Sequence, residues 1–447
     1  MKVLLIQPPC DKEIPIGYKR DYSKKARSPL PPLGLLYLAG HIKKHHDVKV
    51  LDMEFLRQGI CELPAIINSF QPELVGVPSV IGLWPTVIEI FNLVKKVNSS
   101  IYTVVGGPNA TQYPEETLSF KAIDFLIVGL GQLPLMELCN QLEKGQSGVE
   151  IDNCYVQGRS YSHYETKQSK EYTLNDFELP DREAVPFSQY YVSFCPANPT
   201  TTMVTSIGCP FKCAFCDCHN HSLQLCTAEK VVDEIEVIHK MGIKSILFQD
   251  DLFTFKPQRV KQICESLIER KIGLHWSVKS RIDCIQPWMP ELMKKAGCFN
   301  IHFGIESGNK ATLVRMKKGY NPEQIKKAVQ IVKKAGLACT GNFMLAYPGE
   351  DEKDIRNNIA FANALKLDLT QFSITLDLPR TELFDEAVKS GRYHGNPWSE
   401  FTKNPERIDL VEMFSSELFP PKRLFDFLDE AYQSTKTLYN MERSKYE

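Results

Sequence analysis

The sequence lacks a hydrophobic run long enough to cross a membrane. Its apolar beginning, MKVLLIQPP, is ended by prolines and is too short for a signal-peptide core. It also lacks an excess of charge of one sign, because the formal net charge is −1. No overall field therefore favours nucleic acid or an anionic membrane. We expect a cytoplasmic protein with no transmembrane segment and no nucleic-acid partner.

Sequence repeats of a fixed short period and low-complexity segments are absent as well. Hydrophobic residues make up 43% of the chain and charged residues 24%, which are ordinary values for globular proteins. A length of 447 residues predicts two or three domains.

The chain is rich in cysteine, but it has no second CxxC pair of the kind that structural zinc sites use. The chain has 14 cysteines, and a cytoplasmic setting argues against a disulfide framework. Most are scattered, which is typical of buried packing. One cluster stands out, formed by Cys209, Cys213, Cys216 and Cys218, and it indicates metal binding or catalysis.

The first 145 residues alternate short apolar runs with amphipathic stretches. Continuous apolar strands between helices indicate a parallel sheet covered on both faces, so we expect an α/β, doubly wound, Rossmann-like domain over residues 1–145. The expected helices are Leu33–Ile42 and Val87–Val94; the expected strands are Lys2–Ile6, Val48–Leu51, Leu74–Val80, Tyr102–Val105 and Phe125–Val128.

Two segments around this domain lack periodicity. Residues 11–31 are rich in Lys, Arg and Pro, which fits either a solvated surface loop or a lid over a ligand. Residues 146–200 are polar with scattered aromatics, and we interpret them as a linker.

The alternation resumes after the linker. Six β/α units predict a partial barrel over residues 201–385, and residues 386–447 form a C-terminal helical tail with an amphipathic helix at 421–440. The expected barrel strands are Met203–Ile207, Ser245–Phe248, His275–Val278, Asn300–Gly304, Gly341–Leu345 and Phe372–Leu376; the expected helices are Thr227–Met241, Pro257–Arg270, Asn321–Ala335 and Asp351–Leu365.

Cys209, Cys213 and Cys216 form a CxxxCxxC loop after the first expected barrel strand. Three thiolates can each bind one iron of a 4Fe–4S cubane, which leaves the fourth iron open to another ligand. Structural zinc is the competing interpretation, but it requires four ligands, usually in paired CxxC units. Cys218 or His219 would have to supply the fourth.

This loop resembles the radical S-adenosylmethionine (SAM) superfamily in its spacing, its position and its aromatic Phe215. The resemblance implies that Cys209, Cys213 and Cys216 hold an oxygen-sensitive 4Fe–4S cluster. The open iron would chelate SAM, and electron transfer would cleave it to methionine and a 5′-deoxyadenosyl radical. Cys218 falls outside the family triad.

The same resemblance assigns SAM contacts to the strand ends that follow. Each feature alone is a weak signal, since a carboxylate or an arginine can serve in a surface ion pair, but together they occur in the family's order. The expected SAM-binding residues are Phe215, Asp250, Asp251, Arg281, Glu306, Ser307 and Met344.

Residues 1–145 resemble the cobalamin-binding domain that precedes the barrel in one radical SAM subclass. Glycines at the carboxyl ends of strands suit the approach of a ligand. The sequence departs from that subclass at Leu130 and Gln132, where it usually reads GEGE, and it lacks the DxHxxG motif of other cobalamin proteins. A domain that only docks a partner is the alternative. The expected cobalamin contacts are Leu33, Gly34, Ser79, Gly106, Gly107, Gly129 and Gly131.

The resemblance implies methyl transfer to a poorly activated carbon or phosphorus of a small molecule or natural-product precursor. A flavodoxin or ferredoxin would donate the electrons. A radical cyclase or rearrangement enzyme of the same architecture is the alternative, and a non-catalytic binding protein is a third. Arg380 replaces the Gly of the family's Pro-Gly-Thr and fits either a solvated side chain or a contact to an anionic substrate.

Overall fold

The computed structural model describes residues 1–10, 29–146, 150–159, 172–218, 222–406 and 418–435. These residues divide into two compact units. Unit 1 holds the described residues up to 187 together with 396–406, and unit 2 holds the other described residues. No helix among the described residues is long and apolar enough to cross a bilayer. Most of the possible lid, residues 11–28, and the candidate zinc ligand His219 lie outside the described residues.

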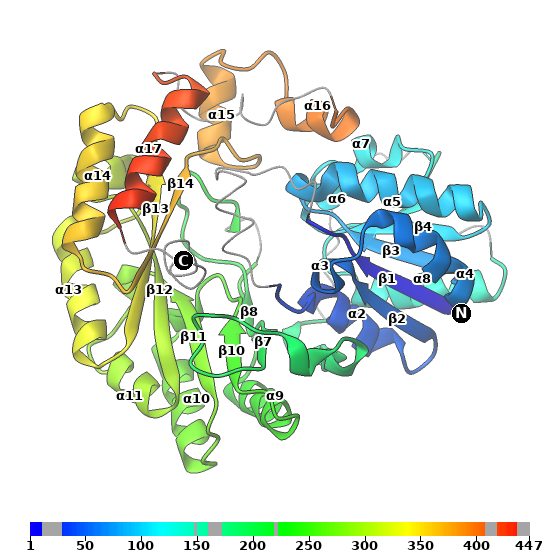
Figure 1. Ribbon diagram of the computed structural model, residues 1–447, viewed down its shortest axis with the longest axis horizontal. Helices are drawn as coiled ribbons and strands as arrows, with labels where there is room; N and C mark the ends of the chain where they lie inside the picture. The colour runs from blue at the N-terminus through cyan, green and yellow to red at the C-terminus, as the bar shows by residue number, and fades with distance from the viewer. Residues whose placement is uncertain (11–28, 147–149, 160–171, 219–221, 407–417, 436–447) are drawn as a thin grey trace. The chain divides into compact units, whose positions relative to one another are not determined.

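Unit 1 is built on sheet A, whose strands run in the order β2-β1-β3-β4-β5-β6 (Figure 1). The first five strands are parallel, and β6 pairs antiparallel with β5. Residues 3–6 of β1 are almost fully buried, as expected for a strand covered on both faces. The strands are β1 Lys2–Gln7, β2 Asp47–Asp52, β3 Leu74–Pro78, β4 Tyr102–Gly106, β5 Phe125–Ile127 and β6 Cys154–Val156.

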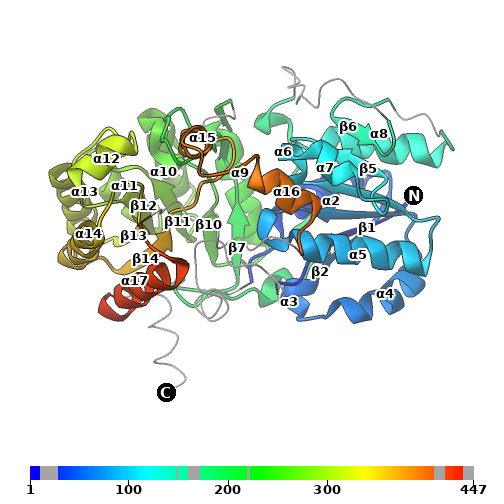
Figure 2. The ribbon, with the colours of Figure 1, turned by 90° about the horizontal axis from the view of Figure 1, so that it is seen from above.

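Helices cover both faces of sheet A, which confirms the predicted doubly wound fold (Figure 2). Helix α2 packs beside α8, and α4 packs beside α5. The helices are α2 Leu33–Ile42, α3 Met53–Leu56, α4 Leu63–Phe70, α5 Trp84–Val97, α6 Pro108–Gln112, α7 Pro114–Leu118, α8 Gln132–Glu143 and α16 Pro397–Lys403.

Two elements of unit 1 come from segments that the sequence placed elsewhere. Strand β6 lies within the expected linker; three residues are too few to show an alternation. Helix α16 lies within the expected C-terminal tail but packs beside α7. Its Trp398 and Phe401 are fully buried, and Trp84 Nε1 donates a hydrogen bond to the Thr402 carbonyl at 2.8 Å. Long-range burial, which a local pattern does not encode, decides both placements.

Unit 2 is built on sheet B, a parallel six-stranded half-barrel in the order β14-β13-β12-β11-β10-β7. This confirms the predicted partial barrel. The strands are β7 Thr200–Met203, β10 Ser245–Phe248, β11 His275–Ser280, β12 Cys298–Glu306, β13 Ala338–Leu345 and β14 Leu369–Ile374.

The first barrel strand ends at Met203, so the prediction that it extends to Ile207 is wrong. Ser206–Ile207 form a separate strand, β8, which pairs antiparallel with β9, Gln224–Leu225. Between β7 and β8, the Thr205 amide donates to the buried Asp250 carboxylate at 2.6 Å and not to a backbone carbonyl of sheet B.

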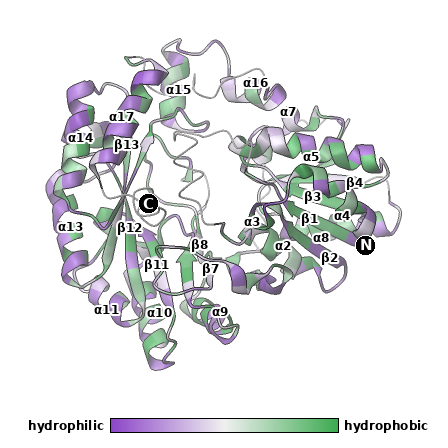
Figure 3. Cartoon of the chain, in the orientation of Figure 1, coloured by the Kyte–Doolittle hydropathy of each residue, from purple (hydrophilic) through white to green (hydrophobic). Residues whose placement is uncertain are grey.

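The helices of unit 2 are amphipathic and turn their polar sides outward (Figure 3). Helix α13 begins where the sequence predicts, with Asn321 and Gln324 forming a capping box. The helices are α9 Ala228–Lys240, α10 Pro257–Glu269, α11 Met289–Lys295, α12 Lys310–Arg315, α13 Pro322–Lys334, α14 Glu352–Ala364, α15 Glu382–Lys389 and α17 Pro421–Ser434.

Candidate cofactor sites

The cysteine loop of unit 2 follows β8 and is tied down at several points. Cys209 N–H donates to the Cys218 carbonyl at 3.2 Å, and Cys216 N–H donates to the Cys213 carbonyl at 3.1 Å. Ala214 joins the loop to two other segments, through bonds with Met316 and Leu383. The loop is therefore ordered by its own backbone and by unit 2.

Asp250 and Asp251 hold the start of this loop. Asp250 is fully buried and accepts hydrogen bonds from Thr205 and from Ser206 Oγ. Burial raises the pKa of Asp250, while these hydrogen bonds oppose the shift. Asp251 is exposed and accepts from the Gly208 amide at 3.0 Å. Both were expected to contact SAM; in the described contacts Asp250 acts as an internal anchor and Asp251 still has an exposed carboxylate.

Arg281 lies against the middle of the loop. Its guanidinium forms a bidentate pair with Asp283 at 2.9–3.0 Å and donates to Cys213 Sγ at 3.3 Å. It also donates to the Lys318 carbonyl at 2.5 Å and stacks 3.8 Å from the Phe211 ring centroid. The side chain is 8% exposed. Arg281 is thus already paired with the Asp283 carboxylate and also contacts the cysteine loop; its predicted contact with SAM stays a prediction.

Glu306 and Lys318 form a buried ion pair at the end of β12. Their Oε1 and Nζ atoms are 3.3 Å apart, and the side chains are only 12% and 5% exposed. Burial lowers the pKa of Lys318, but Tyr320 and Glu306 raise it, and the net shift is upward. Glu306 has φ +66°, a conformation that is uncommon outside glycine and often marks functional sites. Lys318 was not predicted as a site residue from the sequence, because it follows a short helix and not a strand.

The remaining expected SAM contacts, Phe215, Met344 and Ser307, lie in two different environments. Phe215 and Met344 pack against the same apolar cluster, so the loop and the end of β13 meet there. Ser307 is fully buried, and its Oγ accepts from the Asn309 amide at 3.1 Å. Asn358 of α14, also missed from sequence, donates to the Glu306 and Met344 carbonyls and so joins the ends of β12 and β13.

The triad cysteines fit an iron–sulfur cluster. Cys213 is buried and Cys209 and Cys216 are half-buried, all of them free thiols. Burial raises the pKa of Cys209, whereas a hydrogen bond with Cys218 lowers that of Cys216. The Arg281 guanidinium lies beside Cys213, with Nη1 3.3 Å from its Sγ.

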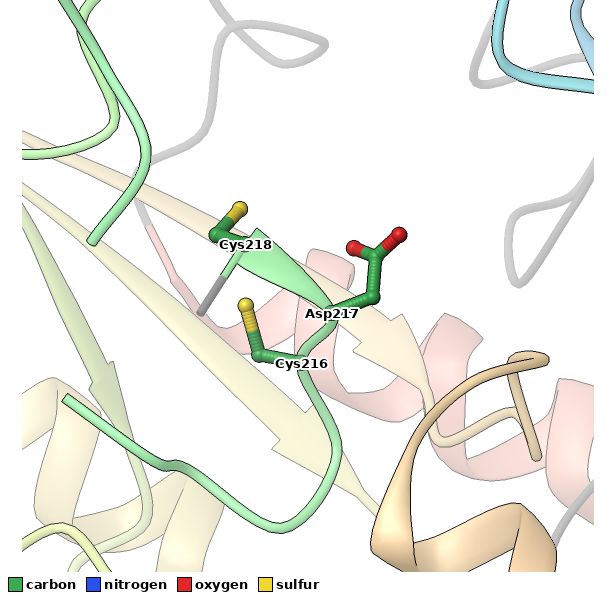
Figure 4. Close-up of side chains that lie close together, drawn as sticks. All are labelled: Cys216, Asp217 and Cys218. Carbon is green, nitrogen blue, oxygen red and sulfur yellow. The ribbon is translucent and has the colours of Figure 1, made fainter. Parts of the chain in front are cut away.

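One smaller group at this loop suits a single metal ion in its spacing. Cys216 Sγ, an Asp217 carboxylate oxygen and Cys218 Sγ lie within 4.8 Å of one another (Figure 4). These are three consecutive residues, and structural zinc requires four ligands. The group by itself therefore does not complete a zinc site.

In unit 1, exposed apolar side chains follow the carboxyl ends of several strands of sheet A. The strand order reverses at β1, and ligands bind at such switch points. Four apolar side chains near this edge are 37–43% exposed: Leu30 before α2, Val80 after β3, Leu130 after β5, and Leu133 at the start of α8. Exposed apolar side chains at the edge of a sheet where ligands bind are consistent with a binding surface.

The expected cobalamin residues divide into two groups at this edge. A Cβ at Gly34 would meet nothing within 4 Å, and one at Gly106 would make only an ordinary contact. Gly107, in contrast, has φ +95°, and a Cβ there would lie 2.8 Å from the Ser79 carbonyl oxygen. Ser79 Oγ itself donates to the Gly106 carbonyl. Gly107 and Ser79 are thus required to join β3 to β4.

The other three expected residues lie nearby. Leu33 begins α2 and is half-buried. Gly129 has φ +77°, and its amide donates to Thr111 Oγ1 at 3.0 Å. Gly131 precedes α8, where a Cβ would lie 3.2 Å from Leu38.

Comparison with known proteins finds a family match in each of the two predicted α/β domains. The radical SAM superfamily model matches residues 203–362, and the B12 binding domain model matches residues 20–139. The chain is 29% identical over 425 residues to an uncharacterised methyltransferase of Pyrococcus horikoshii, covering 93% of this chain and 89% of that protein. It is 24% identical over 434 residues to the anaerobic magnesium-protoporphyrin IX monomethyl ester cyclase of Rubrivivax gelatinosus, covering 93% and 77%.

The fold is shared with a solved structure. The radical SAM methyltransferase TsrM of Kitasatospora setae, with cobalamin and a [4Fe–4S] cluster bound, superposes with a TM-score of 0.72 at 15% identity, covering 97% of this chain and 89% of that one. With the triad loop at the head of a half-barrel and a doubly wound sheet before it, the chain belongs to the radical SAM superfamily, in the subclass with a B12-binding domain.

Proposed function

We propose that this protein is a cobalamin-dependent radical SAM methyltransferase. The observation that carries the proposal is that the methyltransferase relative shares more identity with the chain than the cyclase relative does, at equal coverage of the chain. The acceptor is a poorly activated carbon or phosphorus of a small molecule. A flavodoxin or ferredoxin supplies the electrons.

The residues divide between three cofactors. The cluster with SAM supplies a 5′-deoxyadenosyl radical when bound, and cobalamin supplies a methyl carrier. Cys209, Cys213 and Cys216 ligate the cluster, and residues 201–385 form the catalytic domain. Residues 1–145 bind cobalamin through the edge that holds Leu33, Gly34, Ser79, Gly106, Gly107, Gly129 and Gly131.

SAM is held at the ends of the barrel strands. Phe215 and Met344 offer apolar contact, and Glu306 and Ser307 form the polar rim at the end of β12. Asp251 offers charge to the SAM amino group, and Lys318 holds the Glu306 carboxylate in place through their ion pair. Asp250 and Arg281 act through the cysteine loop that they hold.

Product stoichiometry tests the proposal. In each methylation, one SAM gives 5′-deoxyadenosine and a second gives S-adenosylhomocysteine. Anaerobic holoenzyme treated with a strong reductant and SAM, without substrate, should form about one S-adenosylhomocysteine per bound corrin. A cyclase needs only the radical, so 5′-deoxyadenosine without S-adenosylhomocysteine would favour that alternative. Absence of both products would leave a non-catalytic binding protein.

A further inference from the structure

The inner face of sheet B carries a row of polar side chains below the cofactor site. Successive side chains of a strand point to opposite faces. In β12, Ile301, Phe303 and Ile305 are fully buried, while His302 and Glu306 lie on the other face and are partly exposed. His302 therefore shares a face with the proposed SAM contact Glu306.

Polar residues continue this row on the neighbouring strands. Lys279 of β11 is in register with His302, and Asn342 of β13 is in register with Gln371 of β14. Gln249 follows directly on β10. We call these five residues the polar belt; it spans β10 to β14, which lie side by side in sheet B (Figure 1).

Two hydrogen-bond contacts join side chains of the belt to one another. His302 Nε2 and Asn342 Oδ1 are 2.7 Å apart. Lys279 Nζ donates to Gln249 Oε1 at 3.4 Å. His302 is held neutral near pH 7, because burial lowers its pKa to about 4. The belt thus offers fixed neutral polar groups beside one ammonium.

The belt has an apolar floor. Leu247 lies two residues before Gln249, on the same face of β10, and packs against Val192 and Cys195. Phe194 and Phe299 complete this cluster. An apolar cluster therefore lies beside the belt on the amino-terminal side of Gln249, and Glu306 and Met344 lie toward the carboxyl ends of β12 and β13.

The Lys279 ammonium has hydrogen-bond donors that Gln249 does not use. It is exposed, and within the described ranges it forms no salt bridge. An ammonium has three donors, and only one of them reaches Gln249. The cations that follow it along the face are already paired, Arg281 with Asp283 and Lys318 with Glu306. Among the described residues, Lys279 therefore brings to the belt a positive charge that has no salt-bridge partner.

We propose that the polar belt is the substrate-recognition site and that it binds a small molecule through a carboxylate. One ammonium matches a single negative charge, whereas a phosphate carries nearly two at neutral pH. The neutral amides and imidazole supply further hydrogen bonds to the bound molecule. The proposal rests on the proposed function, because it takes the barrel interior as the place where the substrate is held.

The strand geometry limits the distance from anchor to reacting atom. Lys279 lies two residues before Arg281, or about 7 Å along the strand, and His302 lies four residues before Glu306, or about 13 Å. The reacting atom of the substrate is therefore several bonds away from its carboxylate.

Fluorine NMR of a carboxylate probe tests the belt without the true substrate. Anaerobically reconstituted holoenzyme is titrated with 4-fluorobenzoate and, separately, with its neutral analogue 4-fluorobenzamide. We expect saturable broadening with the benzoate, at least about tenfold weaker binding of the amide, and no displacement by equimolar inorganic phosphate. Absence of saturable benzoate binding, equal binding of the amide, or displacement by phosphate would overturn the proposal.

Substitutions in the belt test whether the benzoate probe binds there. Lys279→Met removes the charge but keeps the stem, and Gln249→Glu neutralises the ammonium in place; each should weaken benzoate binding by about tenfold or more. Lys327→Met, on the exposed surface of α13, is the matched control and should bind as wild type. Wild-type affinity in both belt variants would refute the assignment. Because no turnover is needed, benzoate binding without S-adenosylhomocysteine formation would reject methyl transfer but keep the belt.

Discussion

Replacing Arg281 with Met should chiefly lower the free energy needed to open the cysteine loop. The change removes a bidentate pair with Asp283, a donor to Cys213 Sγ and a stacked contact on Phe211. Hydrogen bonds between charged groups contribute about 1.5–3 kcal/mol, and a cation over a ring contributes about 1 kcal/mol. The Asp283 carboxylate is partly exposed, so water can solvate it once its partner is removed. The loss of that partner therefore adds little to the free-energy cost. We expect the loop to open more easily by about 2–4 kcal/mol.

Thiol labelling of the apoprotein measures that opening. A change of about 2–4 kcal/mol corresponds to roughly 30- to 700-fold faster modification where opening limits the reaction. Mass spectrometry separates Cys213 from the other cysteines, and Cys298, which is fully buried in β12, serves as the internal standard. Reconstituted iron content should fall in parallel.

The matched control is Arg270→Met. Arg270 also pairs with two carboxylates, Asp233 and Glu236, but its side chain is 38% exposed and far along the chain from the loop. Its loss should leave the labelling of Cys213 unchanged. If Arg281→Met labels like wild type but has lost SAM affinity, the guanidinium acts on SAM directly and our reasoning is wrong.

Three further outcomes are expected. Alanine at any triad cysteine should abolish the cluster EPR signal, whereas Cys218→Ala should retain it; iron loss in Cys218→Ala would make Cys218 a ligand. Gly107→Ala should destabilise unit 1 even without cobalamin, by roughly 1–3 kcal/mol, because its φ is +95° and the Cβ would meet the Ser79 carbonyl at 2.8 Å; an unchanged thermal midpoint of the apoprotein would contradict this. Glu350 is buried, and burial raises its pKa from 4.5 to about 7. The folded state then binds the extra proton between these values, so stability should fall by about 3 kcal/mol as the pH rises from 4.5 to 7, and Glu350→Gln should remove this fall in thermal melts; identical pH profiles would exclude it.

Local patterns of the sequence were enough for most of the scaffold. The strand Ser245–Phe248 was predicted with the bounds that the structure gives, and α13 begins after Asn321 as its cap requires. Both follow from short-range chemistry, a continuous apolar run and a side chain that satisfies free amides. The cysteine spacing, which lies within one loop, was equally visible.

The partners of individual side chains could not be predicted from the sequence in the same way. Asp250 and Arg281 were expected to face SAM, and only their burial against Thr205 and Cys213 shows how they hold the loop. Lys318 was missed because its value lies in its pairing with Glu306, twelve residues earlier in the chain.

The sequence by itself determined the fold class and the cofactor family, and it predicted the cluster ligands, because the apolar runs and the cysteine spacing are local patterns. The tertiary structure decided that α16 packs on unit 1, that Gly107 is required by the Ser79 carbonyl, and that Lys279 bonds to Gln249 and forms no salt bridge with any described residue. These depend on which distant groups share a buried space. Burial and charge pairing are properties of that space, and no local pattern encodes them.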